Sequence, residues 1–241
     1  MKYTLALSGT FDVENYGDLL FPEIFKRSMI KRGLDFELLP FSPGSSENEL
    51  NGSFNGHVYS IREIEKINEQ TPIDAVLIGG GSLIHFNNIK VRLPGEKESI
   101  NNYKSPYSWF LPALFAAEKN INLLFNLPQV PFEISEEFKP ITKEILKYSK
   151  YISFRDSFSA EFIKNAYSEN ETIPEITVCP DSVCCISDLI KKEELKKYFE
   201  KLNIKKPYAV LHLNLTMNPK DREYIAECIK YIKSQGLEVV M

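Results

Sequence analysis

Long apolar runs are missing from this chain of 241 residues. The longest one near a predicted helix, Trp109–Ala117, has roughly half the length of a membrane span and contains Pro112. The first residues, Met1–Leu7, are too few for the apolar core of a signal peptide, and the charged Asp12 and Glu14 follow soon after them. We therefore expect a cytoplasmic protein without a transmembrane segment.

Cysteine and histidine are scarce, with four residues of the first kind and three of the second. No two cysteines have the two-residue gap of a zinc knuckle, so the sequence predicts free thiols and no metal site. An excess of positive charge is absent too, and the net charge of −4 argues against a broad nucleic-acid surface. Small anionic ligands are compatible with this charge, because one local cluster of arginine and helix amides can hold a phosphate.

What the chain does have is a regular alternation of short apolar runs with segments of helical period. The runs are continuous rather than mixed with polar residues, which is typical of strands covered on both faces. We predict strands over Tyr3–Ser8, Phe36–Phe41, Ala75–Ile78, Asn122–Asn126, Tyr151–Phe154, Thr177–Cys179, Tyr208–Leu213 and Leu237–Val240. We predict helices from Asp18 to Gly33 and near Ser60–Glu69, Tyr107–Lys119, Ser135–Lys147, Ser157–Tyr167, Glu193–Leu202 and Lys220–Ser234. The alternation predicts an α/β fold with a Rossmann-like, doubly wound and mostly parallel sheet.

Two polar stretches, Ser42–Tyr59 and Asn87–Ser105, interrupt this pattern, and we predict that both are long loops. We expect His57, inside the first of them, to have no role. A charged segment rich in Lys and Glu then precedes a fresh strand. We predict an N-terminal domain over residues 1–187, a linker helix over 188–206 and the beginning of a second Rossmann-like domain over 207–241. Because the chain stops inside a predicted strand, we expect that second domain to be incomplete.

The segment Asn15-Tyr16-Gly17-Asp18 follows the first predicted strand and starts the first predicted helix. We predict that Asp18 caps this helix. The first amides of a helix lack internal partners and carry partial positive charge, so Asn15 and Gly17 are candidates for a ligand-binding turn. A capped helix start without any ligand is the alternative. The Asp18 carboxylate would repel a phosphate, so a sugar hydroxyl is its better partner.

Four segments together resemble the polysaccharide pyruvyl transferase family. They are Gly9–Pro22, Asp74–Leu83 with its triplet Gly79-Gly80-Gly81, Tyr151–Ala160 and Val178–Val183. The resemblance implies a glycosyltransferase-B-like architecture of two Rossmann-like domains with the active cleft between them. It also implies transfer of an enolpyruvyl unit from phosphoenolpyruvate to sugar hydroxyls, which leaves a pyruvate ketal on a cell-surface polysaccharide or its precursor. It implies no cofactor beyond the donor substrate. Family members are longer and carry an Arg-x-His-Gly segment that this sequence lacks, so we expect the chain to be either a fragment or a protein that has lost the half that does the chemistry.

This chemistry needs cations for the donor phosphate and carboxylate. Arginine suits the task because its planar fork grips such groups with two hydrogen bonds. Arg155 follows a predicted strand at the end where open α/β sheets place ligands, and an ion pair with Asp156 or a neighbouring helix is its structural alternative. Gly80 and Gly81 end another buried strand, where they form either a plain tight turn or a ligand-facing loop.

The reaction also needs a general acid for the enol carbon and a general base for the hydroxyl. Histidine suits proton transfer because its ordinary pKa lies near neutrality. We predict His85, Asp181 and His212 as candidates, and Asn214 as a substrate contact beside His212. Each has a structural alternative, such as a satisfied core histidine or a turn-forming Asp after Pro180. Trp109 and its aromatic neighbours form either a sugar-stacking platform or, as we expect, part of the core.

Two other functions remain open from the sequence. One is a sugar-nucleotide glycosyltransferase of the same architecture, and the other is a non-catalytic sugar-binding module. In each case we expect partners that are small molecules, namely a donor and a saccharide or lipid-linked saccharide acceptor. We expect no nucleic acid. An unpaired strand edge after Met241 would favour a homo-oligomer.

Overall fold

A computed structural model describes residues 2–13, 15–44, 46–50, 54–91, 100–193, 195–196, 200, 207–211 and 219–240. The chain divides into two compact units, Met1–Leu189 and Ile190–Met241. The predicted boundaries after residues 187 and 206 stay a prediction. Among the described residues, no helix is both long and apolar enough to cross a membrane.

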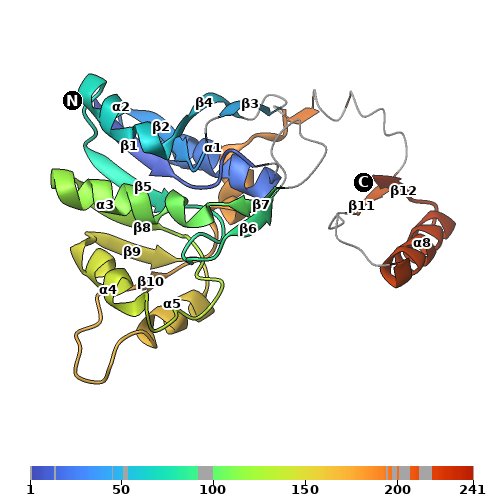
Figure 1. Ribbon diagram of the computed structural model, residues 1–241. Coiled ribbons are helices and arrows are strands. Elements are labelled where there is room, and N and C mark those ends of the chain that lie inside the picture. Colours follow the sequence, from blue (N-terminus) through green and yellow to red (C-terminus); the bar gives the residue numbers. More distant parts are fainter. Residues whose placement is uncertain are drawn as a thin grey trace. The chain divides into compact units, whose positions relative to one another are not determined.

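The first unit is built on one sheet of eight strands in the order β10-β9-β8-β5-β1-β2-β4-β3 (Figure 1). Every neighbouring pair is parallel except β3 and β4, which form an antiparallel hairpin at one edge. The strands are β1 (Tyr3–Ser8), β2 (Phe36–Ser42), β3 (Ser46–Leu50), β4 (Phe54–Ser60), β5 (Ala75–Gly79), β8 (Asn122–Asn126), β9 (Tyr151–Phe154) and β10 (Thr177–Val178). The predicted α/β, Rossmann-like, mostly parallel sheet is therefore confirmed. Its pairing with a second domain of the glycosyltransferase-B kind stays a prediction.

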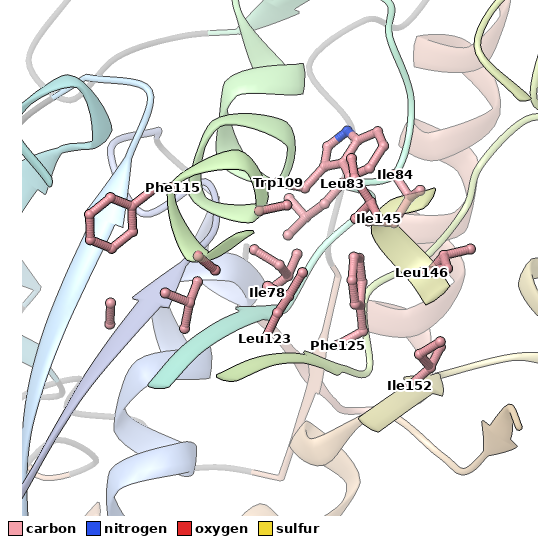
Figure 2. Close-up of a cluster of buried hydrophobic side chains, with 14 of the residues drawn as sticks. Ile78, Leu83, Ile84, Trp109, Phe115, Leu123, Phe125, Ile145, Leu146 and Ile152 are labelled. Carbon is pink, nitrogen blue, oxygen red and sulfur yellow. The ribbon is translucent and has the colours of Figure 1, made fainter. Parts of the chain in front are cut away.

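Helices cover both faces of this sheet, which explains the continuous apolar runs. Successive residues of a strand point to opposite faces, so each face needs its own apolar set. In β1, Ala6 belongs to one buried cluster and Leu7 to the other. Trp109, Phe115 and Ile145 cover the Ala6 face, and Figure 2 shows these side chains around the strands. Trp109 is therefore part of the core, as expected.

The helices of the first unit lie between the strands along the chain. They are α1 (Tyr16–Lys31), α2 (Ile64–Gln70), α3 (Phe110–Lys119), α4 (Lys139–Tyr148), α5 (Ser157–Lys164) and α6 (Ile186–Leu189), with short 3₁₀ turns η1 (Ile61–Glu63), η2 (Ser105–Ser108) and η3 (Ser182–Cys185). Leu19, Phe21 and Phe25 of α1 pack on Leu7 and Leu77, so α1 covers the face opposite to that of Trp109.

Both stretches predicted as long loops contain strands, so those predictions were wrong. Ser42–Tyr59 includes the β3–β4 hairpin, and Asn87–Ser105 includes the antiparallel strands β6 (Ile89–Val91) and β7 (Ile100–Tyr103). His57 lies in β4 with its ring against Tyr59, at 4.4 Å between ring centroids. Polar hairpins carry little apolar periodicity, and their strands form through pairing with each other, which local composition does not reveal.

The connections of the sheet reverse direction between β1 and β5. From β1 the chain moves through α1 to β2 on one side, and it later returns to β5 on the other side of β1. At such a switch point the two following loops diverge and leave a crevice at the carboxyl ends of the strands, where open α/β sheets bind ligands.

The second unit contains β11 (Tyr208–Val210), α8 (Pro219–Ser234) and β12 (Glu238–Val240). β11 and β12 are parallel, and Tyr208 lies opposite Glu238. This is the strand–helix–strand pattern predicted for this segment, although β11 is shorter than predicted. Most of the helix predicted over Glu193–Leu202 lies outside the described residues.

Candidate functional site at the switch point

The two loops of the switch point approach each other at Asp18 and Gly81. Asp18 lies in the first turn of α1, which follows β1, and Gly81 follows β5. A Cβ atom placed on Gly81 would lie 2.7 Å from Asp18 Oδ1 and 3.5 Å from Thr10 Oγ1. Gly81 also has a φ of +77°, which favours glycine. Glycine at this position therefore allows the second loop to lie directly against the Asp18 carboxylate.

Asn15, not Asp18, caps helix α1, so the predicted cap was wrong. Asn15 has extended backbone geometry, and its Oδ1 accepts a hydrogen bond from the Gly17 amide at 3.2 Å. Its Nδ2 donates to Asp18 Oδ2 at 3.0 Å. Asn and Asp are equally good caps, and the short polar loop before the helix leaves the choice open from sequence. Because Asn15 takes the capping position and the Gly17 amide, the Asp18 carboxylate is turned toward the switch point.

The Asp18 carboxylate is half-buried and accepts a second hydrogen bond from Thr10 Oγ1 at 2.9 Å. Burial raises the pKa of Asp18 to about 6, and the bonds from Thr10 and Asn15 and the positive charge of Arg155 offset this only in part. A carboxylate with a pKa near neutrality can accept and return a proton under physiological conditions.

Gly80 has a structural task. It has a φ of +80°, and a Cβ atom there would lie 2.5 Å from Cγ of Phe21, in the core of α1. For Gly80 the structure thus favours the tight-turn alternative, whereas Gly81 faces the cluster around Asp18. Substrate binding by either glycine stays a prediction.

Arg155 directly follows β9, at the same edge of the sheet. Its Nη1 donates to Asp181 Oδ2 at 3.0 Å, and its Nη2 donates to Ser82 Oγ at 3.3 Å and to Gln129 Oε1. Ser82 Oγ also donates to Gln129 Oε1 at 2.6 Å. Asp156 does not form the ion pair considered from the sequence; its Oδ1 instead accepts from the Ser159 amide and caps α5.

A guanidinium has five N–H donors, and the three bonds of Arg155 leave at least two without a partner among the described residues. The Arg155 side chain is 25 % exposed. It can therefore hold a phosphate or carboxylate oxygen while its own position is fixed by Asp181 and Gln129.

Asp181 uses both of its oxygens. Oδ2 accepts from Arg155, and Oδ1 accepts from the Val183 amide at 3.0 Å, which caps η3. This geometry is that of a residue that positions the guanidinium. Its proposed role as acid or base remains a prediction.

His85 lies in the loop after β5, and both of its ring nitrogens have a neighbour within hydrogen-bond distance. Its Nδ1 accepts from the Asn87 amide at 3.1 Å, so the neutral ring carries its proton on Nε2, which lies 3.2 Å from Ser105 Oγ. Burial lowers the pKa of His85, so the imidazole is neutral at physiological pH. The catalytic role predicted for it is not tested by these contacts.

His212 and Asn214 lie outside the described residues, and their predicted roles stay predictions. Of the other site residues predicted from sequence, the structure brings Asn15, Gly17, Asp18, Gly81, Arg155 and Asp181 into one neighbourhood. Sequence reasoning missed Thr10 and Gln129. Gln129 comes three residues after the end of β8, and a polar residue just past a buried strand is the signal that could have identified it. Within the described part of the chain, no group of three or more His, Cys, Asp or Glu could hold a metal ion.

Fold and site together define a Rossmann-like α/β domain whose switch point holds a guanidinium, Arg155, and a carboxyl group with a pKa of about 6, Asp18. The family model for polysaccharide pyruvyl transferase matches residues 15–241. The chain belongs to the polysaccharide pyruvyl transferase family, which is a family of enzymes. Comparison with curated proteins gives no significant match, and neither does comparison with solved structures.

Proposed function

We propose that the protein transfers the enolpyruvyl unit of phosphoenolpyruvate to a saccharide and closes it into a pyruvate ketal. One sugar hydroxyl adds to C2 of the donor as the methylene carbon takes a proton, and inorganic phosphate leaves. A second hydroxyl of the same sugar completes the ketal. The products are a sugar that carries a methyl group and a carboxylate on the ketal carbon, and phosphate. The acceptor would be a cytoplasmic saccharide or lipid-linked precursor of a cell-surface polysaccharide.

The observation that carries this proposal is the pair of Arg155 and Asp18 at one switch point. The donor has a phosphate and a carboxylate, and Arg155 offers N–H donors in a planar fork to either of them. The acceptor offers a hydroxyl, and Asp18 offers a carboxylate whose pKa of about 6 suits removal of its proton. The site thus combines a cation that can bind the anionic donor with a carboxylate that can take a proton from the acceptor.

The remaining chemical requirement is an acid for the methylene carbon. Asp181, His85 and His212 remain the candidates for it. Asp181 lies directly beside Arg155, and an acid so placed would stand near the bound donor.

The decisive experiment incubates the full chain with phosphoenolpyruvate labelled with ¹³C at the methylene carbon and a panel of sugar acceptors. The expected result is acceptor-dependent release of phosphate together with a new ¹³C methyl signal of a ketal. A parallel reaction with uridine diphosphate sugars tests the glycosyltransferase alternative. Glycosyl transfer, or phosphate release without a ketal signal, would contradict the proposal.

A further inference from the structure

A cavity of about 240 Å³ lies beside the switch point, on the two loops that follow β5 and β8. Its walls include His85 and Asn87 from the first loop and Phe132, Glu133 and Glu137 from the second. Neither the proposed donor chemistry nor the family match accounts for it. The cavity is somewhat smaller than the roughly 300–1,000 Å³ of sites for drug-sized ligands, so its size fits one sugar ring better than a nucleotide sugar.

The same two loops build the site around Arg155. The Gln129 amide donates to the Gly81 carbonyl at 2.9 Å, and the Ile84 amide donates to the Gln129 carbonyl at 3.1 Å. Leu83 and Ile84 anchor the first loop in the core beside Trp109 (Figure 2). Ser82 and Gln129 contact Arg155, and the residues three positions further along each loop, His85 and Phe132, line the cavity. A ligand in the cavity is therefore held by the backbone that also fixes the guanidinium.

The charge of the cavity disfavours the anionic donor. No Lys or Arg is among its lining residues, His85 is neutral, and two carboxylates, Glu133 and Glu137, take part in the lining. Neither carboxylate has an ion pair or hydrogen bond to the described residues. Like charges repel, so a phosphate or carboxylate ligand is disfavoured here. A neutral ligand whose hydroxyl groups donate hydrogen bonds is favoured.

The aromatic part of the cavity supplies the complementary surface. Phe132 is 54 % exposed although it is a large apolar residue, and its ring lies edge-on to His85 at 6.1 Å between centroids. Phe86 and Phe138 also line the cavity, and their rings are stacked at 3.9 Å between centroids. An exposed aromatic face next to unpaired hydrogen-bond acceptors matches a sugar ring, which has an apolar C–H face and a rim of hydroxyl donors.

We propose that this cavity binds a neutral sugar ring of the saccharide acceptor, beside the place where the donor is held. The inference rests on the proposed function for the identity of the second substrate. Phe132 stacks on the C–H face of the sugar, and Glu133 and Glu137 accept hydrogen bonds from its hydroxyls. These residues set which acceptor is used and take no part in the chemical step.

The test measures direct binding first, because it does not depend on turnover. Saturation-transfer NMR of the full chain is recorded with methyl glucoside, methyl galactoside and methyl mannoside. At least one is expected to bind, and Phe132→Ala is expected to weaken its affinity about five- to tenfold, as loss of one aromatic contact would. Phe132→Leu keeps an apolar side chain and controls for folding. Tyr151→Ala removes an exposed aromatic ring from the amino end of β9, whereas the cavity lies on loops that follow the carboxyl ends of β5 and β8, so it is expected to leave binding unchanged.

The carboxylates have a matched control in the same segment. Glu133→Gln and Glu137→Gln are each expected to weaken hexoside binding, whereas Glu136→Gln is not, because Glu136 does not line the cavity and pairs with Lys139. Inorganic phosphate is expected not to displace the hexoside. Displacement by phosphate would indicate an anion site, displacement by tetramethylammonium would indicate a cation site, and either would overturn the assignment. Hexoside binding that is equal in Phe132→Ala and the unaltered protein, or undetectable at millimolar concentration, would overturn it too.

Failure of the proposed function and failure of the sugar site give different results. If hexosides bind and Phe132→Ala weakens them while phosphoenolpyruvate is never consumed, the sugar site stands and the donor assignment falls. If the enzyme is active, Phe132→Ala is expected to raise the KM for the acceptor with an unchanged KM for phosphoenolpyruvate. A change in the donor KM alone would overturn the sugar site.

Discussion

The Tyr103 hydroxyl donates a hydrogen bond to the Asp12 carboxylate, which lies 91 residues earlier in the chain. Both side chains are buried, and the Gly44 amide donates to the other oxygen of Asp12 at 2.7 Å. Three segments, the loops after β1 and β2 and the end of β7, therefore meet at one carboxylate just before α1 begins. This contact fixes the segment that presents Asn15 and Asp18.

Tyr103→Phe tests that contact. Burial raises the pKa of Asp12, and the Tyr103 hydroxyl is one of the groups that lower it again. Removing the hydroxyl leaves the ionised carboxylate less well satisfied, so we expect a loss of about 1–3 kcal/mol in the free energy of unfolding. The loss should be larger at high pH than at low pH, because the Tyr103 hydroxyl lowers the pKa of Asp12 and so stabilises its ionised form. Urea unfolding followed by fluorescence of Trp109, the single and fully buried tryptophan, measures it.

The matched control for this prediction is Tyr151→Phe. Tyr151 is exposed, and its hydroxyl has no hydrogen bond to the described residues, so a change within about 0.5 kcal/mol is expected. Equal effects of the two substitutions would show that the Tyr103 hydroxyl does not stabilise Asp12.

Asp18→Asn is expected to stabilise the protein at high pH while it abolishes activity. The pKa of Asp18 is raised from 3.8 to about 6 in the folded protein, so between these values the folded state binds more protons than the unfolded state. Stability due to this group therefore falls as the pH rises from about 4 to 6, by an amount on the order of 1–3 kcal/mol. Asparagine can accept the same bonds from Thr10 and Asn15 without this cost. The loss of a negative charge at the start of α1 offsets part of the gain.

Urea unfolding of both proteins at pH 4 and pH 8 measures this difference, which should be small at pH 4 and in favour of the variant at pH 8. In the active protein, kcat/KM should fall below a pH of about 6, as the base becomes protonated. A pH profile that is flat through this range would remove Asp18 from the proposed role of base.

Gly81→Ala, compared with Gly33→Ala, separates the effect of crowding by neighbouring atoms from the effect of backbone strain. Gly33 has the same φ of +77° but no atom within 4 Å of an added Cβ, so Gly33→Ala should cost only about 1–2 kcal/mol of left-handed strain. Gly81→Ala adds a contact of 2.7 Å with Asp18 Oδ1, which forces the carboxylate to move. We expect a larger loss of stability and a large loss of kcat. Equal stability of the two variants, with activity kept, would contradict this account.

Arg155→Lys keeps the charge but loses the planar fork that joins Asp181, Gln129 and Ser82. We expect the KM for phosphoenolpyruvate to rise about tenfold, the equivalent of about 1.4 kcal/mol, while the melting temperature changes by a few degrees. Arg32→Lys, at the exposed end of α1, is the control and should leave the kinetics unchanged. A variant that unfolds while the surviving fraction keeps the original KM would show that Arg155 is a structural ion-pair residue.

The sequence by itself determined the strands of the central sheet, whereas the switch point follows from the strand order of the structure. β1, β8 and β9 have the predicted bounds, because each is a continuous apolar run and burial on both faces leaves that mark on the residues themselves. A second rule, that ligand-binding residues of such sheets follow the strand ends directly, made Asn15, Asp18, Gly81 and Arg155 candidates, and their ligand roles stay predictions.

Only the tertiary structure decided which of these residues meet and what state they are in. The approach of Gly81 to Asp18, the bond of Gln129 to Arg155 and the bond of Tyr103 to Asp12 join parts of the chain that are tens of residues apart. The raised pKa of Asp18 follows from burial by those neighbours. Local composition carries periodicity and turn preference, whereas pairing across strands and the burial of a charge depend on the packing of distant segments.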